Sequence, residues 1–106
     1  MSKSITIIKT RKMKDIIIKT NGVVTQTEPF NGQYYELGEL KHIVGGFIEI
    51  KELTDNKSMV MNELGKLDGL PYNKVATAMY RSAYPLSNDY IVGDVLVCDS
   101  EHILNF

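Results

Sequence analysis

Five polar side chains in the second half of the chain have the chemistry to hold a polar ligand. They are Asn62, Glu63, Lys66, Asn73 and Asp94. Carboxylates, an ammonium group and amides are the groups that hydrogen-bond a nucleotide base or a ribose hydroxyl. Four of the five occur in one connection, residues 62–73, which is rich in the residues of shaped turns. We therefore expect a ligand-binding cleft between this connection and the start of the helix that follows it.

Each of these residues also has a structural interpretation. Asn62 and Gly65 suit a tight turn, and Asn73 suits the N-cap of a helix. The Gly93–Asp94 pair is typical of a bulge or of a close approach between backbones. The two interpretations predict different effects of alanine. At a ligand-binding residue alanine removes binding and leaves the melting temperature nearly unchanged, whereas at a structural residue it lowers stability.

The sequence offers no recognisable catalytic centre. No nucleophile, base and oxyanion-stabilising group occur at a familiar spacing, and no phosphate-binding G-x-x-x-x-G-K-[ST] string is present. His42 and His102 have no second ligand at metal-binding spacing. The single cysteine, Cys98, excludes an internal disulfide, and its apolar neighbours favour a buried, inert thiol. We therefore expect no catalytic residue, no metal and no cofactor, and the sequence favours a protein that is not an enzyme.

Length and composition indicate one small domain. A chain of 106 residues with 43% hydrophobic and 24% charged residues is ordinary for a globular protein. It has room for one core but not for a deep cavity, so a ligand site is expected in a surface cleft or between subunits. It contains no apolar stretch of the roughly 20 residues that span a membrane and no signal-peptide pattern. These features predict a cytoplasmic protein with no membrane partner.

Charge is unevenly distributed along the chain. Residues 1–20 carry six basic side chains and one acidic one, and residues 21–106 carry six basic and twelve acidic ones, which gives +5 against −6. The positive charge centres on Lys9, Arg11, Lys12 and Lys14. This cluster is either a patch for nucleic-acid phosphates or a solvated turn whose lysines protect a strand edge. Because no aromatic residues interleave with the charges, the solvated turn is favoured.

Two hairpins are predicted from the spacing of apolar and turn residues. The β-prone runs at residues 15–20 and 23–28 are joined by Asn21-Gly22, which predicts a type I′ turn because both central residues of that turn need positive φ. Residues 47–53 alternate with period two and, with residues 58–62, form the second predicted hairpin. Both faces of the strand at residues 47–53 carry apolar and charged residues, so the sequence does not identify which face is buried.

Other parts of the chain predict helices and further strands. These are helices over residues 34–44 and 73–83, strands over residues 5–8 and 91–97, and a short edge or tail over residues 103–106. Gly45 is placed to end the first helix in a left-handed conformation. The buried stripe of the second helix is expected at Val75, Ala78, Met79 and Ala83. Because no βαβ repeat is visible, we predict an α+β domain. Its mixed or antiparallel sheet has about five to six strands, with two helices on one face.

Glycine and asparagine motifs carry a resemblance to a known family. The strings are Val44-Gly45-Gly46-Phe47-Ile48-Glu49, then Asn62-Glu63-x-Gly65-Lys66-Leu67-x-Gly69-Leu70-Pro71-x-Asn73, then Gly93-Asp94-Val95. Over residues 35–98 the chain resembles a domain-of-unknown-function family of bacteriophages and bacterial mobile elements. Leu64 stands where that family usually has a second acid. The resemblance implies a small accessory protein of the kind used for host takeover or anti-defence, and it implies no particular reaction.

These observations define the functional expectation. The single domain, residues 1–106, divides into a basic hairpin region (1–32), a family-like core (33–98) and a tail (99–106). We expect a non-enzymatic accessory protein of a phage or mobile element, in the cytoplasm of a bacterial host. It would bind a host protein or sequester a small polar, nucleotide-like host molecule, and it has tyrosines enough for a homo-oligomeric interface. The alternative is a nucleic-acid-associated protein that uses the basic cluster. A small hydrolase or nucleotide-modifying enzyme is the weakest of the three.

Overall fold

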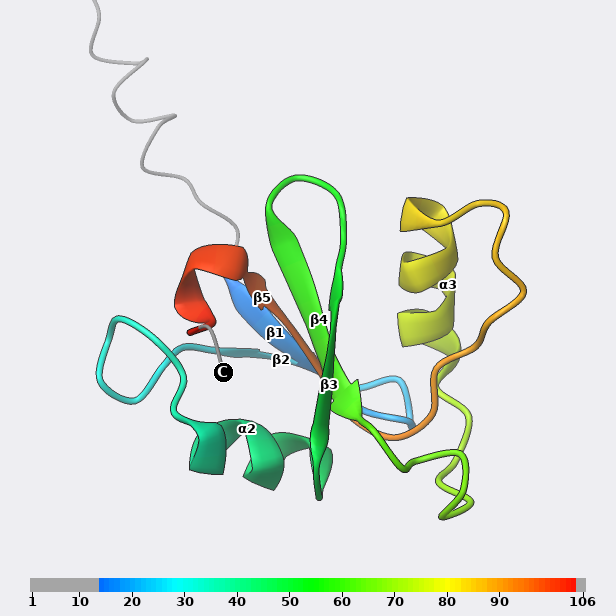
Figure 1. The fold of residues 1–106 in the computed structure, drawn as a ribbon, viewed down its shortest axis with the longest axis horizontal. Helices are drawn as coiled ribbons and strands as arrows, with labels where there is room; N and C mark the ends of the chain where they lie inside the picture. Colours follow the sequence, from blue (N-terminus) through cyan, green and yellow to red (C-terminus); the bar gives the residue numbers. More distant parts are fainter. Residues whose placement is uncertain (1–13, 105–106) are drawn as a thin grey trace, which may run out of the picture.

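The computed structural model describes residues 14–104, which form a five-stranded antiparallel sheet flanked by two helices (Figure 1). The elements in chain order are β1 (Asp15–Ile18), β2 (Val24–Thr27), α2 (Leu37–Val44), β3 (Ile48–Glu52), β4 (Lys57–Asn62), α3 (Lys74–Ala83), β5 (Val95–Asp99) and a 3-10 helix, η1 (Ser100–His102). This is the predicted α+β class. The strand expected at residues 5–8 lies outside the described residues.

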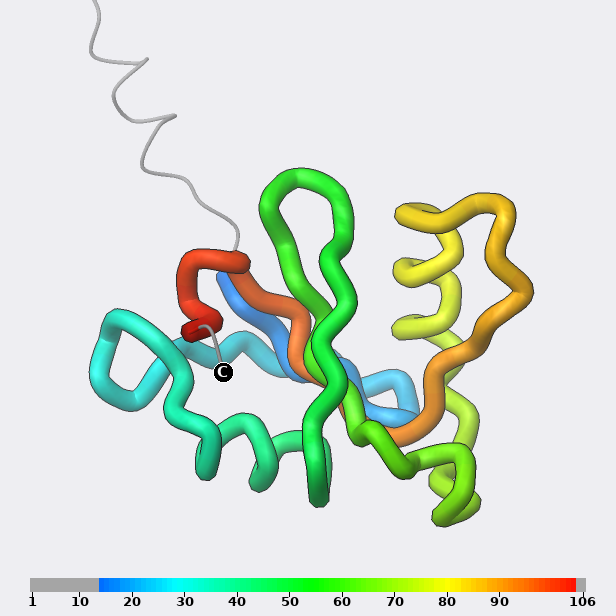
Figure 2. The backbone as a smooth tube through the Cα atoms, in the orientation of Figure 1, coloured from blue at the N-terminus to red at the C-terminus, as the bar shows by residue number. Residues whose placement is uncertain are grey.

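The last strand occupies the middle of the sheet. The strand order is β2-β1-β5-β4-β3, so β5 lies between the two hairpins that precede it in the chain. The tube in Figure 2 shows the orange path of β5 entering between the blue and green segments. Strands β4 and β5 are almost entirely buried. The core therefore lies on both sides of these two central strands.

The two helices cover opposite faces of the sheet, which corrects the prediction that they share one face. Successive residues of a strand point to opposite faces. On β4, Met59 and Met61 pack in the cluster that contains Ala76 and Tyr80 of α3. Val60, between them, packs in the other cluster, with Leu40 and Val44 of α2. Figure 1 shows α2 and α3 on either side of the strands.

The first hairpin forms as predicted, but its turn is of another type. Among the described non-glycine residues only Asp55 and Asn56 have positive φ, so Asn21 does not meet the requirement of a type I′ turn. Instead the N–H of Lys19 donates to the carbonyl of Val23 at 2.9 Å, which closes a three-residue loop. Gly22, with φ of +91°, occupies its left-handed position. The side chain of Asn21 accepts from the N–H of Val23, which favours this local geometry.

The type I′ geometry occurs in the second hairpin. Asp55 (φ 59°) and Asn56 (φ 58°) are its two central residues, between β3 and β4. The buried side of β3, which the sequence left open, is the one that carries Ile48 and Ile50, because both pack against the α2 cluster. The alternating residues Glu49 and Lys51 therefore lie on the face that α3 covers.

Helix boundaries follow from capping. Helix α2 begins at Leu37, where the N–H of Glu36 donates to the carboxylate of Glu39 at 3.1 Å. It ends, as predicted, at Gly45 with φ of +80°. Helix α3 also has its predicted extent, but its buried stripe does not. Its buried residues are Ala76, Thr77 and Tyr80, whereas Val75 and Ala78 are exposed. Only the partly buried Met79 and Ala83 of the predicted stripe face inward.

The final strand begins later than predicted. Residues 91–97 were expected, but β5 runs from Val95 to Asp99. Gly93 has φ of +78°, which interrupts extended structure, and Val92 makes only an isolated bridge with Tyr72. At the C-terminal end, Ile103 forms an isolated parallel bridge with Tyr35. Within residues 14–104 there is no helix long and apolar enough to cross a membrane.

Candidate functional site: a charged cleft beside the outer hairpin

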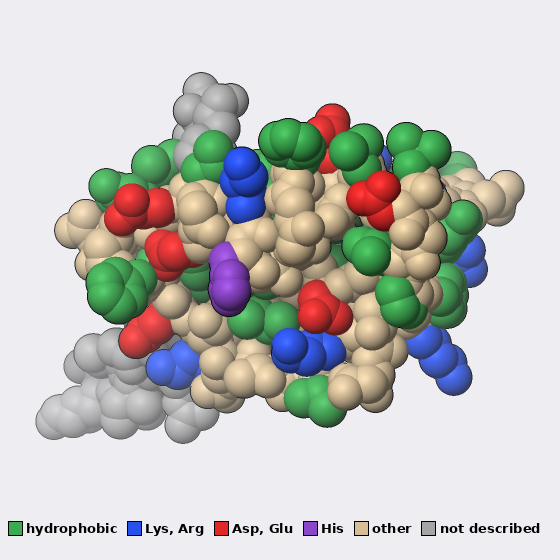
Figure 3. Space-filling model, turned by 90° about the horizontal axis from the view of Figure 1, so that it is seen from below, with side chains coloured by type: hydrophobic (Ala, Val, Ile, Leu, Met, Phe, Trp, Pro, Cys, Tyr) green, Lys and Arg blue, Asp and Glu red, His purple; other side chains and the backbone are tan. Residues whose placement is uncertain are grey.

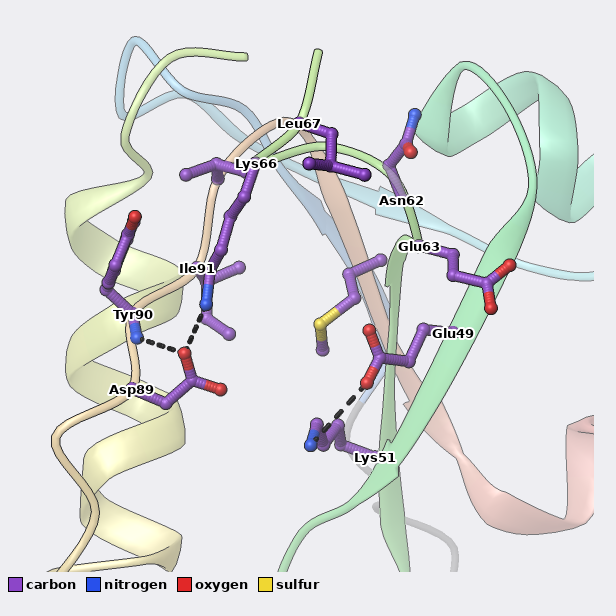
Figure 4. A pocket seen from close by; sticks show the side chains of 11 residues that line it. Glu49, Lys51, Asn62, Glu63, Lys66, Leu67, Asp89, Tyr90 and Ile91 are labelled. Atoms are coloured by element: carbon purple, nitrogen blue, oxygen red, sulfur yellow. Dashed lines mark hydrogen bonds and ion pairs between the residues drawn. The ribbon is translucent and has the colours of Figure 1, made fainter. Parts of the chain in front are cut away.

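A small cleft lies between the β3–β4 hairpin and the segment that leads from α3 to β5. Its volume is about 100 Å³. The polar side chains that line it are Glu49, Lys51, Asn62, Glu63, Lys66 and Asp89, and the apolar ones include Leu67 and the buried Met61. Figure 4 shows these residues approaching from three elements that are far apart in sequence. The connection that the sequence singled out thus forms one wall of a real cleft.

Lys66 is fixed across the cleft by two partners. Its ammonium group donates to Asp89 Oδ1 in a short ion pair. The same nitrogen lies 4.3 Å from the centroid of the Tyr90 ring, in cation–π geometry. The hydrogen bond from Lys66 lowers the pKa of Asp89 below its ordinary value, and the N–H of Tyr90, 2.8 Å from Asp89 Oδ1, adds to this. The cleft therefore keeps Asp89 ionised and Lys66 oriented.

The opposite wall carries a second pair of opposite charges. Lys51 Nζ lies 3.5 Å from Glu49 Oε2 on the same strand, β3. Both side chains point into the cleft, whereas the exposed carboxylate of Glu63 points away from the Lys66–Asp89 pair (Figure 4). The interior thus presents two compensated ion pairs, and Glu63 belongs to its rim. Alternating charges of this kind orient a partner of complementary pattern.

Asn62 borders the cleft, but its side chain points away from it toward α2, and its amide is used inside the protein (Figure 4). Asn62 Nδ2 donates to the carbonyl of Val44 at 3.1 Å, and Asn62 Oδ1 accepts from the N–H of Leu64 at 2.9 Å. A Cβ added at Gly46 would lie 3.0 Å from Asn62 Nδ2. The glycine therefore leaves room for this side chain. Asn62 fastens the end of α2 to the end of β4, which is a structural role.

Asn73 lies away from the cleft and is fully buried. Its Oδ1 accepts from the N–H of Ala76 at 3.0 Å, which is the N-cap bond that the sequence predicts. Its Nδ2 donates to the carbonyls of Ile18 at 3.0 Å and of Gly93 at 2.8 Å. The side-chain amide thus joins three segments, and both of its amide protons are used.

Asp94 belongs to a different, shallower hollow. Its Oδ1 accepts from the N–H of Thr20 at 3.0 Å, and its Oδ2 lies 3.8 Å from Lys19 Nζ. The hollow is also lined by His42 and Gly45. Figure 3 shows the lower face of the molecule, where acidic and basic side chains are interspersed and a histidine lies among them. The structure thus brings Asn62, Glu63 and Lys66 together and places the other two candidates elsewhere.

Comparison with known families gives a match over almost the whole chain. Residues 10–103 match the family described as Domain of unknown function (DUF3846). The chain belongs to the DUF3846 family. The match confirms that the resemblance is to a family of unknown function. Searches of curated proteins and of solved structures found no match.

Four polar residues of this DUF3846 protein's cleft were not predicted as site residues, and neither was the apolar Leu67. The four polar residues are Glu49, Lys51, Asp89 and Tyr90. Asp89 follows Lys66 by 23 residues, and nothing in the spacing signals that the two meet. Glu49 and Lys51 carried a usable signal, because two charged residues on one face of a period-two strand mark that face as incompletely buried.

A second polar cluster of the DUF3846 protein lies on the α2 side. The buried carboxylate of Asp15 accepts from the hydroxyl of Tyr35 at 2.7 Å and from the N–H of Asp99 at 3.0 Å. His102 Nδ1 lies 2.7 Å from Asp15 Oδ2. Burial and the hydrogen bond to Asp15 raise the pKa of Tyr35 far above its ordinary value. This cluster joins the start of β1 to the C-terminal turn, and its contacts are accounted for by that structural role.

The remaining predicted residues have simple placements. Cys98 is fully buried, as expected, and burial raises the pKa of its thiol to about 12. Lys9, Arg11 and Lys12 of the basic cluster lie outside the described residues, and Lys14 is exposed. In residues 14–104 no group of three or more His, Cys, Asp or Glu side chains is arranged to hold a metal ion.

Proposed function

We propose that this DUF3846 protein is a non-enzymatic binding protein that attaches to another protein through the charged cleft and its rim. In the proposed setting it is an accessory protein of a phage or mobile element. It acts in the cytoplasm of a bacterial host, in host takeover or anti-defence. The observation that carries the proposal is the combination, at one cleft, of two oriented ion pairs with a highly exposed Leu67.

The size of the cleft favours a protein partner over a small molecule. Small-molecule sites usually enclose roughly 300 to 1,000 Å³, and this cleft has about 100 Å³. A volume of this kind accommodates one or two side chains of a partner. The proposal therefore narrows the expectation of a host protein or a small host molecule to the first of these.

The rim has the composition of a protein-binding surface. Leu67 is 85% exposed and Tyr90 is 42% exposed, both beside the cleft. Aromatic residues such as tyrosine are enriched at interface centres, where a few residues provide most of the binding energy, and a polar rim surrounds the apolar centre. Leu67 would be the apolar anchor, and Glu63 and the Lys66–Asp89 pair would give orientation.

The test is capture of host proteins from bacterial lysate by the full-length chain and by rim variants. Leu67→Asp and Glu63→Ala should lose the captured protein. Phe30→Asp is the matched control, because Phe30 is a 92% exposed apolar residue in the turn before α2. Wild type and the control should capture the same protein, with circular dichroism showing that all variants fold. Equal capture by Leu67→Asp would contradict the proposal.

Two further measurements on the same samples separate the alternatives. Mass analysis of bound small molecules would instead support sequestration if a ligand co-purifies with wild type and is lost in Glu63→Ala. Mobility-shift assays with DNA and RNA at low salt would support the nucleic-acid alternative if binding falls steeply with salt. A protein partner lost only in the rim variants supports the proposal.

A further inference from the structure

We propose that the open edge of β3 pairs with β3 of a second copy of this chain, antiparallel and centred on Ile50. Among residues 14–104, strand β3 is the last strand of the sheet and pairs only with β4. In Figure 1 it lies in front of the other strands, with α2 on one side and α3 on the other. An edge strand exposes a row of backbone donors and acceptors, which is a template for another strand.

The alternation of backbone bonds shows which groups face the open edge. At the two ends of β3, the N–H of Glu63 donates to the carbonyl of Phe47 at 2.8 Å and the N–H of Leu53 donates to that of Lys57 at 2.7 Å. In an antiparallel pair every second residue bonds to the partner strand, so the odd-numbered residues of β3 bond to β4. The backbone groups of Ile48, Ile50 and Glu52 therefore point outward.

Side-chain charge selects one register among those that this geometry allows. With Ile50 opposite Ile50 of the copy, Glu49 is opposite Lys51 of the copy, and Lys51 is opposite Glu49. Moving the centre by one residue places either Glu49 opposite Glu49 or Lys51 opposite Lys51. Like charges directly opposite each other destabilise a strand pair, and opposite charges stabilise it. Of these three registers, only the one centred on Ile50 avoids the repulsion.

That register is also consistent with the pairing geometry. Glu49 and Lys51 fall at non-hydrogen-bonded positions, where opposing side chains are closest. Their present ion pair is within one strand and partly exposed, so each charge can exchange its partner for one on the copy. On the other face, the partly exposed Ile48 and Ile50 would gain apolar cover. Because the two-fold axis of such a pair is perpendicular to the sheet, the two clefts would open on the same face.

A five-residue strand makes a small interface, so the dimer should be weak and dependent on concentration. Sedimentation velocity over a concentration series measures this directly. The variants are Glu49→Lys, Lys51→Glu and the double exchange of both. Glu28→Lys makes the same change of charge as Glu49→Lys at an exposed residue directly after β2, the strand at the opposite edge of the sheet, and is the control. Circular dichroism should show that every variant retains the fold, because the side chains of Glu49 and Lys51 are partly exposed.

Each outcome of this experiment bears on the proposal. Wild type, the control and the double exchange should dimerise alike, and each single variant should dimerise about tenfold more weakly, because two pairs become repulsive. A mixture of the two single variants should form a heterodimer, since at these two positions one chain would carry only lysines and the other only glutamates. A monomeric wild type at about 1 mM, or dimerisation that the single variants leave unchanged, would overturn the proposal. A monomeric wild type would show that the charges only protect the edge, and dimerisation unchanged in the single variants would mean that the copies associate through another surface.

Discussion

At the scale of single residues, the glycine and asparagine motifs are mainly structural. Asn62 bonds to the carbonyl of Val44, and Gly46 leaves the space that the Asn62 side chain occupies. The Val-Gly-Gly string and the Asn-Glu string therefore contact each other through Val44, Gly46 and Asn62. Among the predicted site residues of these motifs, Glu63 and Lys66 keep side chains that reach solvent or the cleft.

Asn73 provides the clearest test of whether a motif residue has a structural or a ligand-binding role. Asn73→Ala removes the N-cap bond and leaves the buried carbonyls of Ile18 and Gly93 without their donor, so we expect a loss of about 2 to 4 kcal/mol in the free energy of unfolding. Asn73→Asp keeps an acceptor for the N-cap but places a carboxylate against both carbonyls, so it should also destabilise. Urea denaturation measures both variants. An unchanged free energy of unfolding in Asn73→Ala would instead make Asn73 a candidate ligand-binding residue again.

At the scale of elements, local sequence predicted positions better than conformations. Both hairpins were predicted, but the type I′ turn belongs to Asp55-Asn56 and not to Asn21-Gly22. Asn-Gly permits positive φ at both residues without requiring it. In the loop between β1 and β2 only Gly22 of the pair has positive φ. The start of β5 was missed for a related reason. Gly93 was recognised as a possible close contact, but the spacing of residues does not reveal its positive φ, which separates Val92 from β5, or its closeness to the distant Leu70.

Alanine should destabilise the protein more at Gly93 than at Gly69, although both glycines have positive φ. A Cβ at Gly93 would lie 2.9 Å from Leu70 Cδ1, whereas one at Gly69 meets nothing within 4 Å. Gly69→Ala should cost about 1 to 2 kcal/mol from positive φ alone. Gly93→Ala should cost about 1 to 3 kcal/mol more, because the connection must move away. Thermal unfolding measures both, and Leu70→Ala combined with Gly93→Ala should recover part of the additional loss. Equal costs would show that the contact with Leu70 relaxes freely.

At the scale of the whole molecule, the α+β class was predicted correctly, but the placement of the two helices on the faces of the sheet was not. The apolar runs Met59-Val60-Met61 and Val95–Cys98 lack alternation, which is the sign of strands buried on both faces. This signal favours helices on opposite faces, and the expectation of one face overlooked it. The candidate site, too, was predicted only in part. Glu63 and Lys66 were found because they are local to one turn-rich connection, whereas Asp89 reaches the cleft only through the path of the chain after α3.

The Lys66–Asp89 pair joins these two distant segments, so it should make part of the stability of the fold depend on pH. Lys66 lowers the folded pKa of Asp89, so the pair stabilises the protein above the unfolded pKa of about 4 and loses this effect as pH falls through the lower folded value. Because both side chains are about one-third or more exposed, the contribution should stay under about 1 kcal/mol. Asp89→Asn should therefore be less stable than wild type at pH 7, and the difference should shrink between about pH 5 and pH 2. Urea denaturation across this range measures it, with the exposed Asp68→Asn as control. A constant difference between wild type and Asp89→Asn at all pH values would mean that the ion pair does not couple the two segments.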